Sequence, residues 1–339
     1  MYQVVKPFLL QAATSLHPGS GSDVGVVDLP VQRERHTQFP KIEASSLKGA
    51  IRSAAQGRLL PGEPEDVHRC RITLLFGTDP EKARKPGATT QVSAIALSDA
   101  RLLFFPVRSL KGVFAWVTAP MVVRRFKREM ILYGPSGWEE LAEHLPILAS
   151  GTTASPFLWL NEKPRTEDRA SGTVVLEEYA FSVKEDESAR TLARMFDRVL
   201  FGRDLGGEEG LEARLVVLDD DAFRDFVLLS TEVQPRIAID PNTGTVAGKA
   251  LWYEEHLPPE TIFYGFLLVG NAREGEATCR DRTGIRTADD VLQWMADKEK
   301  GFFPSVFQLG GDATVGKGIV ERFWLEPELI QDIIGREPR

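Results

Sequence analysis

Residues 261–270, TIFYGFLLVG, form the stretch that most strongly predicts a buried strand in this chain. The run is short, rich in aromatic and β-branched residues, and ends at a glycine, which is typical of a strand covered on both faces. Working outward, strand-like segments also lie at 2–14, 98–107 and 173–183, and a final one follows residue 318.

Apolar residues at helical spacing predict helices between these strands. In 45–60, SSLKGAIRSAAQGRLL, Leu47 and Ile51 fall on one helical face, and Ser45 or Ser46 can cap the start. The other predicted helices lie at 119–132, 187–202, 219–229 and 287–301, the last with Thr287 and Asp290 as a capping pair.

Composition sets the class of protein. The chain has 339 residues, 42% of them hydrophobic and 27% charged, which is ordinary for a soluble globular protein. The N-terminus carries no signal-peptide pattern, and Cys70 and Cys279 fit no metal-ligand spacing, so a reducing, cytoplasmic environment is the default expectation. The net charge of −8 argues against non-specific nucleic-acid binding but leaves room for a local basic groove.

Two segments stand out in the pass along the chain. Residues 61–90 are rich in proline, glycine and charge, and are predicted to be a mobile surface loop. Residues 230–260 predict two extended arms around a turn, which is a long hairpin projecting from the body. The length allows either two domains or one elaborated domain, and the family resemblance described below implies a single elaborated domain over 1–339.

The glycine-rich stretch 310–318, GGDATVGKG, is close to the phosphate-binding pattern G-x-x-x-x-G-K-[ST]. Gly318 replaces the Ser or Thr that would hold magnesium, and a strand instead of a helix is predicted to follow. Nucleotide hydrolysis is therefore disfavoured. Two interpretations stay open: a plain glycine-rich hairpin, or a loop whose N–H groups and Lys317 meet a phosphodiester.

Three other patterns have competing explanations. Ser45-x-x-Lys48 resembles an acylating serine motif, but its companion motifs are missing, and a helix N-terminus facing a phosphate is the simpler interpretation. The long loop 17–40 mixes acids, bases and glycines, which is typical either of a functional loop or of a solvated surface. In 253–260, YEEHLPPE, the charged residues could simply end a strand.

Four pieces together resemble one family. They are LHPGSGSDVGVVDLPVQRERHTQFPKIEASSLKGAIR (16–52), SDARLLFFPVRSLKGVFAWVTAP (98–120), LWYEEHLPPE (251–260) and LGGDATVGKGIV (309–320). They resemble the RAMP superfamily and, within it, the backbone subunit of the Cmr (type III-B) CRISPR RNA-interference complex. The resemblance covers nearly the whole chain, and its first piece is highly specific.

The resemblance implies an α+β fold with a ferredoxin-like (RRM-type) palm, large insertions and a projecting β-hairpin thumb at 230–260. It implies copies of the chain in a helical filament along guide RNA, in contact with other Cmr subunits. It further implies metal-dependent endonucleolytic cleavage of complementary target RNA at regular intervals, in the cytoplasm and away from any membrane. Two alternatives remain: a purely structural filament subunit, and a stand-alone guide-processing nuclease.

The resemblance also assigns residues. Asp28, in VVDLP, matches the catalytic aspartate and would hold Mg²⁺ or Mn²⁺, and His17, in HPGSG, would either move a proton or shape the loop. At the base of the thumb are Glu254, Glu255 and His256, where the family often has Tyr in place of the histidine. The candidates for binding RNA are Lys48, Arg52, Lys111, Gly310, Gly311, Gly316, Lys317 and Gly318.

Overall fold

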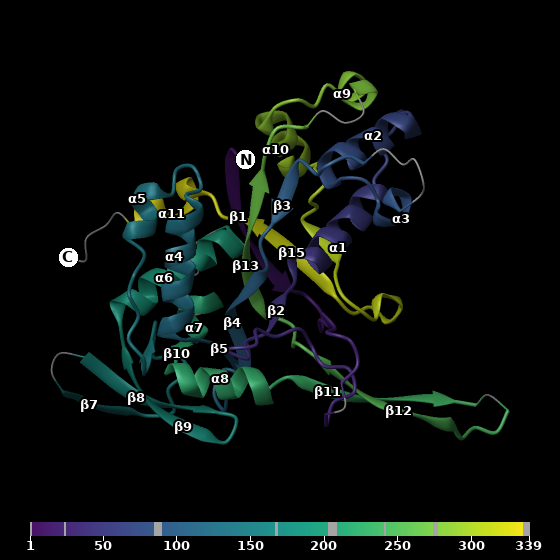
Figure 1. Ribbon diagram of the computed structural model, residues 1–339. Coiled ribbons are helices and arrows are strands. Elements are labelled where there is room, and N and C mark those ends of the chain that lie inside the picture. The colour runs from purple at the N-terminus through teal and green to yellow at the C-terminus, as the bar shows by residue number, and fades with distance from the viewer. Residues whose placement is uncertain are drawn as a thin grey trace.

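A computed structural model shows how these segments assemble (Figure 1). The structure describes residues 2–23, 25–84, 90–166, 169–202, 209–240, 242–273 and 277–334. The strands are β1 Val4–Ala12, β2 Lys41–Ile42, β3 Ile95–Leu97, β4 Ala100–Arg108, β5 Phe114–Thr118, β6 Thr152–Thr153, β7 Glu162–Thr166, β8 Arg169–Leu176, β9 Tyr179–Glu185, β10 Leu215–Val217, β11 Glu232–Ile239, β12 Val246–His256, β13 Ile262–Val269, β14 Val306–Gln308 and β15 Ile319–Trp324.

Helices lie between groups of these strands along the chain. They are α1 Ala44–Gln56, α2 Glu65–Phe76, α3 Pro80–Ala83, α4 Pro120–Tyr133, α5 Glu139–Glu143, α6 Glu187–Phe201, α7 Gly210–Arg214, α8 Asp220–Leu229, α9 Ala277–Thr283, α10 Ala288–Ala296, the 3₁₀ helix η1 Ala313–Val315 and α11 Pro327–Ile334. Within the described ranges, no helix has the length and apolar character needed to cross a membrane.

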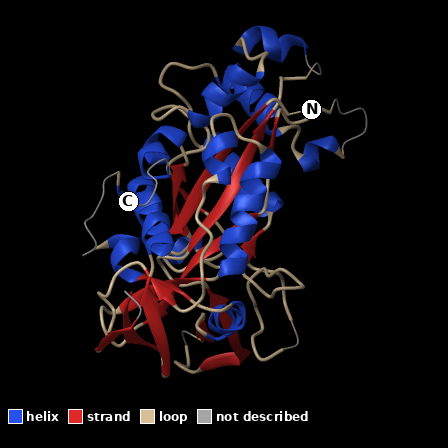
Figure 2. Cartoon of the chain, turned by 90° about the vertical axis from the view of Figure 1, so that its left-hand side faces the viewer, coloured by secondary structure: helices blue, strands red, loops and turns tan. Residues whose placement is uncertain are grey.

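One large sheet runs through the molecule in the order β14-β15-β1-β13-β4-β5-β10-β6-β9-β8-β7. Its central part, β15-β1-β13-β4, is antiparallel throughout. Helix α1 lies in the connection from β1 to β4, and α10 lies in the connection from β13 to β15. Helices flank the long strands on both sides (Figure 2), so the central strands are shielded from water on both faces.

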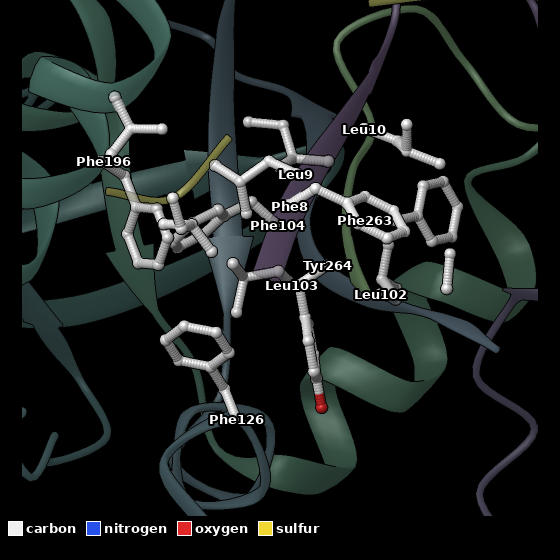
Figure 3. Packing of buried hydrophobic residues seen from close by; sticks show 14 of the residues in the cluster. Phe8, Leu9, Leu10, Leu102, Leu103, Phe104, Phe126, Phe196, Phe263 and Tyr264 are labelled. Atoms are coloured by element: carbon white, nitrogen blue, oxygen red, sulfur yellow. The ribbon is translucent and has the colours of Figure 1, made fainter. Parts of the chain in front are cut away.

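The predicted strand 261–270 is β13, and it lies in this centre. All but one of its residues are buried, which explains why its sequence is almost continuously apolar instead of alternating. Figure 3 shows the surrounding core, where Phe126 of α4 and Phe196 of α6 approach side chains of the sheet. The Phe126 and Tyr264 rings meet edge to face at 5.0 Å.

Gly265 has a packing role in the middle of β13. It lies directly opposite Phe8 of β1, and a β-carbon at this position would come within 2.7 Å of the Phe8 ring. Glycine weakens a strand, but here it makes room for a fully buried aromatic ring from the neighbouring strand.

The hairpin in 230–260 consists of β11 and β12, which form a separate two-stranded sheet and project from the body in Figure 1. Their register runs from Glu232 opposite His256 to Ile239 opposite Val246. Pro241, in the predicted turn, lies outside the described residues.

The structure corrects the predictions for segments 61–90 and 173–183. Segment 61–90 is not a loop throughout, because it contains α2 and α3; residues 85–89 lie outside the described residues. Helix α2 is stabilised by packing that its composition does not reveal, since Leu74, Leu75 and Phe76 are buried. The strand predicted at 173–183 is a hairpin of β8 and β9 that turns at Glu177.

The two cysteines form a disulfide bond across 209 positions of sequence. Cys70 lies in α2 and Cys279 in α9, so the bond links these two helices covalently. The default expectation of a reducing environment offered no reason to predict this pairing.

Candidate functional site

The loop that carries the most specific motif lies along the outer edge of the hairpin strand β12. Leu16 and Leu257 exchange two backbone hydrogen bonds, and further along Leu29 donates to the Tyr253 carbonyl and accepts from Glu255. The loop therefore covers the edge of β12 that does not pair with β11. This contact brings the HPGSG and VVDLP motifs to the base of the hairpin.

Asp28 is exposed and anchored at the same time. Its Oδ2 accepts a 2.7 Å hydrogen bond from the backbone N–H of Tyr253, and its own carbonyl accepts one from Asp23. The other carboxylate oxygen has no hydrogen-bond partner within the described ranges. A carboxylate with one fixed and one available oxygen is suited to binding a proton or a cation at a defined place.

His17, the first residue of this loop, has a buried side chain. Its Nδ1 lies 2.6 Å from the Glu255 carbonyl oxygen. Because a carbonyl can only accept, Nδ1 carries the hydrogen and the neutral ring has its lone pair on Nε2. A β-carbon on Gly19 would lie 2.7 Å from that Nε2, so the ring is closely enclosed.

The glycine-rich loop packs directly on His17. Gly311 donates its N–H to the His17 carbonyl at 3.0 Å, and a β-carbon on Gly310 would come within 2.3 Å of that oxygen. Gly310, Gly316 and Gly318 all have positive φ, which glycine adopts without strain. These glycines let one backbone approach another backbone.

The same loop is not a nucleotide-binding P-loop. The strand expected after it is β15, and no helix follows the lysine directly. Much of its hydrogen-bonding capacity is used internally, by the backbone N–H groups of Gly311, Val315, Gly316, Lys317 and Gly318. These five N–H groups are not available to cradle a phosphate.

Lys317 and Arg236 join the glycine-rich loop to the hairpin. The Lys317 Nζ lies 2.6 Å from Gln234 Oε1 and 3.2 Å from His256 Nε2. Arg236 pairs with Glu254 at 2.7 Å and also with Asp312. Arg236 thus bridges two carboxylates, and Lys317 lies beside His256 at the same junction.

His256 is the buried centre of this junction. Burial lowers the pKa of His256, and the nearby Lys317 charge lowers it further, against the opposing hydrogen bond of 3.1 Å with Asp312. Burial alone would raise the pKa of Asp312, but the hydrogen bonds from His256 and Arg236 outweigh it and the pKa is lowered. At neutral pH the pair is therefore an uncharged imidazole beside a carboxylate.

This junction does not fit a preformed metal cage. The ligand atoms of Glu254, His256 and Asp312 do lie within 4.8 Å of one another. However, Arg236 already pairs with both carboxylates, and the Lys317 ammonium lies beside His256 Nε2, so a divalent ion would have to displace these cations. Asp28 is not part of this group, so it suits only a hydrated ion that takes its other ligands from water and phosphate.

The remaining predicted RNA-binding residues are not brought to this site by any contact within the described ranges. Lys48 donates to Ser93 Oγ at 2.8 Å, and burial lowers the pKa of its ammonium. Arg52 lies 3.8 Å from Asp79, and Lys111 donates to the Trp159 carbonyl. Their proposed contacts with RNA stay predictions.

Helix α1 does not present a free N-terminus to a phosphate. The N–H of Ala44 donates to Asp99 Oδ1 at 2.9 Å, so a carboxylate of the protein itself occupies that end. Neither Ser45 nor Ser46 is the N-cap, which is Glu43.

The sequence did not predict the ion pairs that attach the loop 17–40 to β4 and α4. Glu34 is buried and pairs with Arg101 of β4 at 2.7 Å and with Arg125 of α4 at 2.8 Å. Burial would raise the pKa of Glu34, but Thr37 and the two guanidinium groups outweigh it and the pKa is lowered. The high density of charged residues in 33–36 was the only sign of these ion pairs in the sequence, and it does not identify Arg101 and Arg125 as the partners of Glu34.

Comparison with known proteins supports one family. A model of the RAMP superfamily matches residues 9–321. The chain is 37% identical to the CRISPR system Cmr endoribonuclease Cmr4 of Pyrococcus furiosus over 315 residues, or 92% of each chain. In solved structures it is similar to a chain of a type III-B Cmr-beta complex bound to cognate target RNA, with a TM-score of 0.68, 25% identity and coverage of 98% and 99%. It is also similar to oligomeric Cmr4 from P. furiosus, with a TM-score of 0.60, 30% identity and coverage of 96% and 100%.

Proposed function

The chain belongs to the RAMP superfamily, and on that premise we propose that it is the backbone subunit of a type III-B CRISPR effector complex. In that role it binds guide RNA and cleaves complementary target RNA at regular intervals. The observation that carries the proposal is Asp28, which is exposed yet fixed at the base of the projecting hairpin.

The central sheet supports a ferredoxin-like palm as the fold. Numbering β1, β4, β13 and β15 as strands one to four, their spatial order is 4-1-3-2, with helices in the first and third connections. Segments β5–β12 are then insertions between the second and third strands of the palm, and β11 and β12 are the thumb.

The partners follow from this role. The relatives are named as a Cmr endoribonuclease, an oligomeric Cmr4 and a complex on target RNA. We infer that copies of this chain stack in a helical filament with guide RNA, target RNA and other Cmr subunits, in the cytoplasm. The net charge of −8 is compatible with RNA held in a groove inside such an assembly.

The chemistry is an internal transfer within the RNA. The 2′-hydroxyl loses a proton and attacks the adjacent phosphorus, the bond from phosphorus to the 5′-oxygen breaks, and that oxygen takes up a proton. The products are a 2′,3′-cyclic phosphate and a 5′-hydroxyl. A hairpin that displaces one nucleotide would place the attacking and leaving oxygens in line.

Asp28 is the residue assigned to that step. Its second oxygen would hold a proton of the 2′-hydroxyl or a cation on the phosphate, while its other oxygen stays on Tyr253. A hydrated Mg²⁺ or Mn²⁺ held by Asp28 would supply charge neutralisation at the phosphate. Guide RNA would be held by Lys48, Arg52, Lys111 and the glycine-rich loop, where Lys317 would have to exchange Gln234 for a phosphate.

The test is Asp28→Asn in the reconstituted complex with a labelled target. We expect normal assembly and target binding with cleavage reduced by about 10³-fold or more, and a 2′-deoxy substitution at the cut position to block cleavage by the unaltered complex. Unchanged cleavage by the Asp28→Asn complex would instead favour a purely structural role for this subunit.

A further inference from the structure

Residue 255 holds the catalytic loop through its backbone. Its N–H donates to the Leu29 carbonyl at 3.0 Å, and its carbonyl accepts from His17 Nδ1 at 2.6 Å. One contact is made with the VVDLP motif, at the residue after Asp28, and the other with the HPGSG motif, at His17.

The Glu255 side chain holds the same loop again. Successive residues of a strand point to opposite faces, so Glu255 faces away from the Glu254–Asp312 junction. Its Oε2 accepts from the Val31 N–H at 2.9 Å, and its Oε1 accepts from Arg33 Nη2 at 2.5 Å. Both partners lie just beyond Asp28 in the chain, and both lie on the loop.

Glu255 also reaches the second strand of the hairpin. Its Oε1 accepts a 2.9 Å hydrogen bond from the hydroxyl of Thr231, which directly precedes β11. Arg33 extends the connection by donating to the Val227 carbonyl at the end of α8. One buried carboxylate therefore ties together the loop, both arms of the hairpin and, through Arg33, the helix that leads into it.

The energetics make this a rigid connection. Glu255 is only 6% exposed, and a buried carboxylate is costly unless it is paired. Here both oxygens are hydrogen-bonded, one of them to a guanidinium, so the arrangement is specified by charge as well as by geometry. Removing the negative charge leaves the Arg33 guanidinium facing a neutral partner and weakens the attraction between them.

We propose that Glu255 is a positioning residue that holds Asp28 in register with the hairpin, so that the target is cut beside the nucleotide which the hairpin displaces. This role rests on the proposed function. Asp28 is held on the same strand at Tyr253, two residues from Glu255, so a shift of the loop at Val31 moves the carboxylate relative to the hairpin.

The experiment measures single-turnover target cleavage by complexes that contain Glu255→Gln. Glutamine keeps the size and one acceptor oxygen but loses the charge. We expect guide binding, assembly and target affinity to stay within about twofold, and the cleavage rate to fall about 10- to 100-fold, as small misplacements of catalytic groups do. The matched control is Glu177→Gln, which breaks a 2.9 Å pair with the largely exposed Arg108 and should leave the cleavage rate unchanged.

A double-mutant cycle separates positioning from general damage. Arg33→Gln should slow cleavage to a similar degree, and the double variant should be no slower than the slower single variant. If the losses of cleavage rate in the two single variants add up in the double variant, the proposal is overturned. It is also overturned if the loss of cleavage rate follows the loss of thermal stability in both single variants. If Glu255→Gln does not assemble, Arg33→Gln alone decides, because a normal rate in that variant also contradicts the proposal.

Asp28→Asn in the same assay distinguishes a failure of the positioning role from a failure of the proposed function. If Asp28→Asn is inactive while Glu255→Gln cuts at the unaltered rate, the positioning role is wrong and the proposed function stands. If Asp28→Asn itself cuts normally, the proposed function is wrong whatever Glu255 does.

Discussion

The backbone N–H of Tyr253 donates a 2.7 Å hydrogen bond to Asp28 Oδ2, although 225 positions of sequence separate the two residues. The contact joins the loop to the hairpin, and it uses an oxygen that asparagine also has. Aspartate therefore has two separable functions here, one of geometry and one of charge.

This relationship predicts how Asp28 variants affect stability. Asp28→Asn keeps an acceptor for Tyr253, so its free energy of unfolding should match that of the unaltered chain. Asp28→Ala loses the bond and should be destabilised by about 1 kcal/mol. Urea denaturation of the isolated chain measures both, and equal stability of all three proteins would show that the bond contributes nothing.

The buried position of His17 predicts different results for two substitutions. Glutamine can donate an amide N–H to the Glu255 carbonyl, so His17→Gln should keep cleavage within about threefold, whereas His17→Ala should lose about tenfold or more. The measurement is the single-turnover rate from pH 6 to pH 8 (about the range in which histidine titrates). If His17→Gln is as slow as His17→Ala, and an ionisation vanishes from the profile, His17 moves a proton.

Two glycines of the same loop form a matched pair. Both have positive φ, but a β-carbon at Gly310 meets the His17 carbonyl at 2.3 Å, while one at Gly316 meets nothing within 4 Å. Gly316→Ala should therefore cost only the backbone strain, about 1 kcal/mol, and Gly310→Ala about 3 kcal/mol or more. Thermal or urea unfolding of the two variants side by side tests this, and equal losses would contradict the close approach.

The lowered pKa of Glu34 predicts a pH-dependent contribution to stability. Because the folded-state pKa lies below the ordinary value of 4.5, the contribution is fully present above that value and is lost as the pH falls through the folded-state pKa. Glu34→Gln should cost about 3 kcal/mol at pH 7, since it removes the partner of Arg101 and Arg125, and less as the pH falls toward 3.

Urea unfolding of the Glu34→Gln variant and the unaltered chain at several pH values measures this difference. The pair of Glu177 with the largely exposed Arg108 is the control, and Glu177→Gln should cost less than about 1 kcal/mol. A loss for Glu34→Gln that does not change between pH 7 and pH 3 would exclude the charge of Glu34 as its cause.

The disulfide predicts a stability effect without a catalytic one. Replacing Cys70 with serine opens a link across 209 residues and should lower the free energy of unfolding by about 2–4 kcal/mol under oxidising conditions. Under reducing conditions the two proteins should unfold alike, and cleavage rates should be equal throughout. A difference that persists in reductant would assign the effect to packing of the side chain.

Local sequence was enough to identify several elements. The apolar run of β13 comes from burial on both faces, and the Thr287–Asp290 capping box starts α10 where its pattern indicates. Both signals depend on residues within one turn of a helix or one strand, which is why sequence alone reveals them. The motif around Asp28 was likewise visible because its residues are contiguous.

Only the tertiary structure decided which groups meet. Cys70 pairs with Cys279, Glu255 with Arg33, and Lys317 with Gln234, across separations of 209, 222 and 83 positions. No periodicity or spacing encodes such contacts, because they depend on how loops cross after the sheet has formed. For the same reason the glycine-rich stretch resembled a phosphate loop in sequence, while in the fold most of its identified contacts are with the backbone at His17, with the hairpin and within the loop itself.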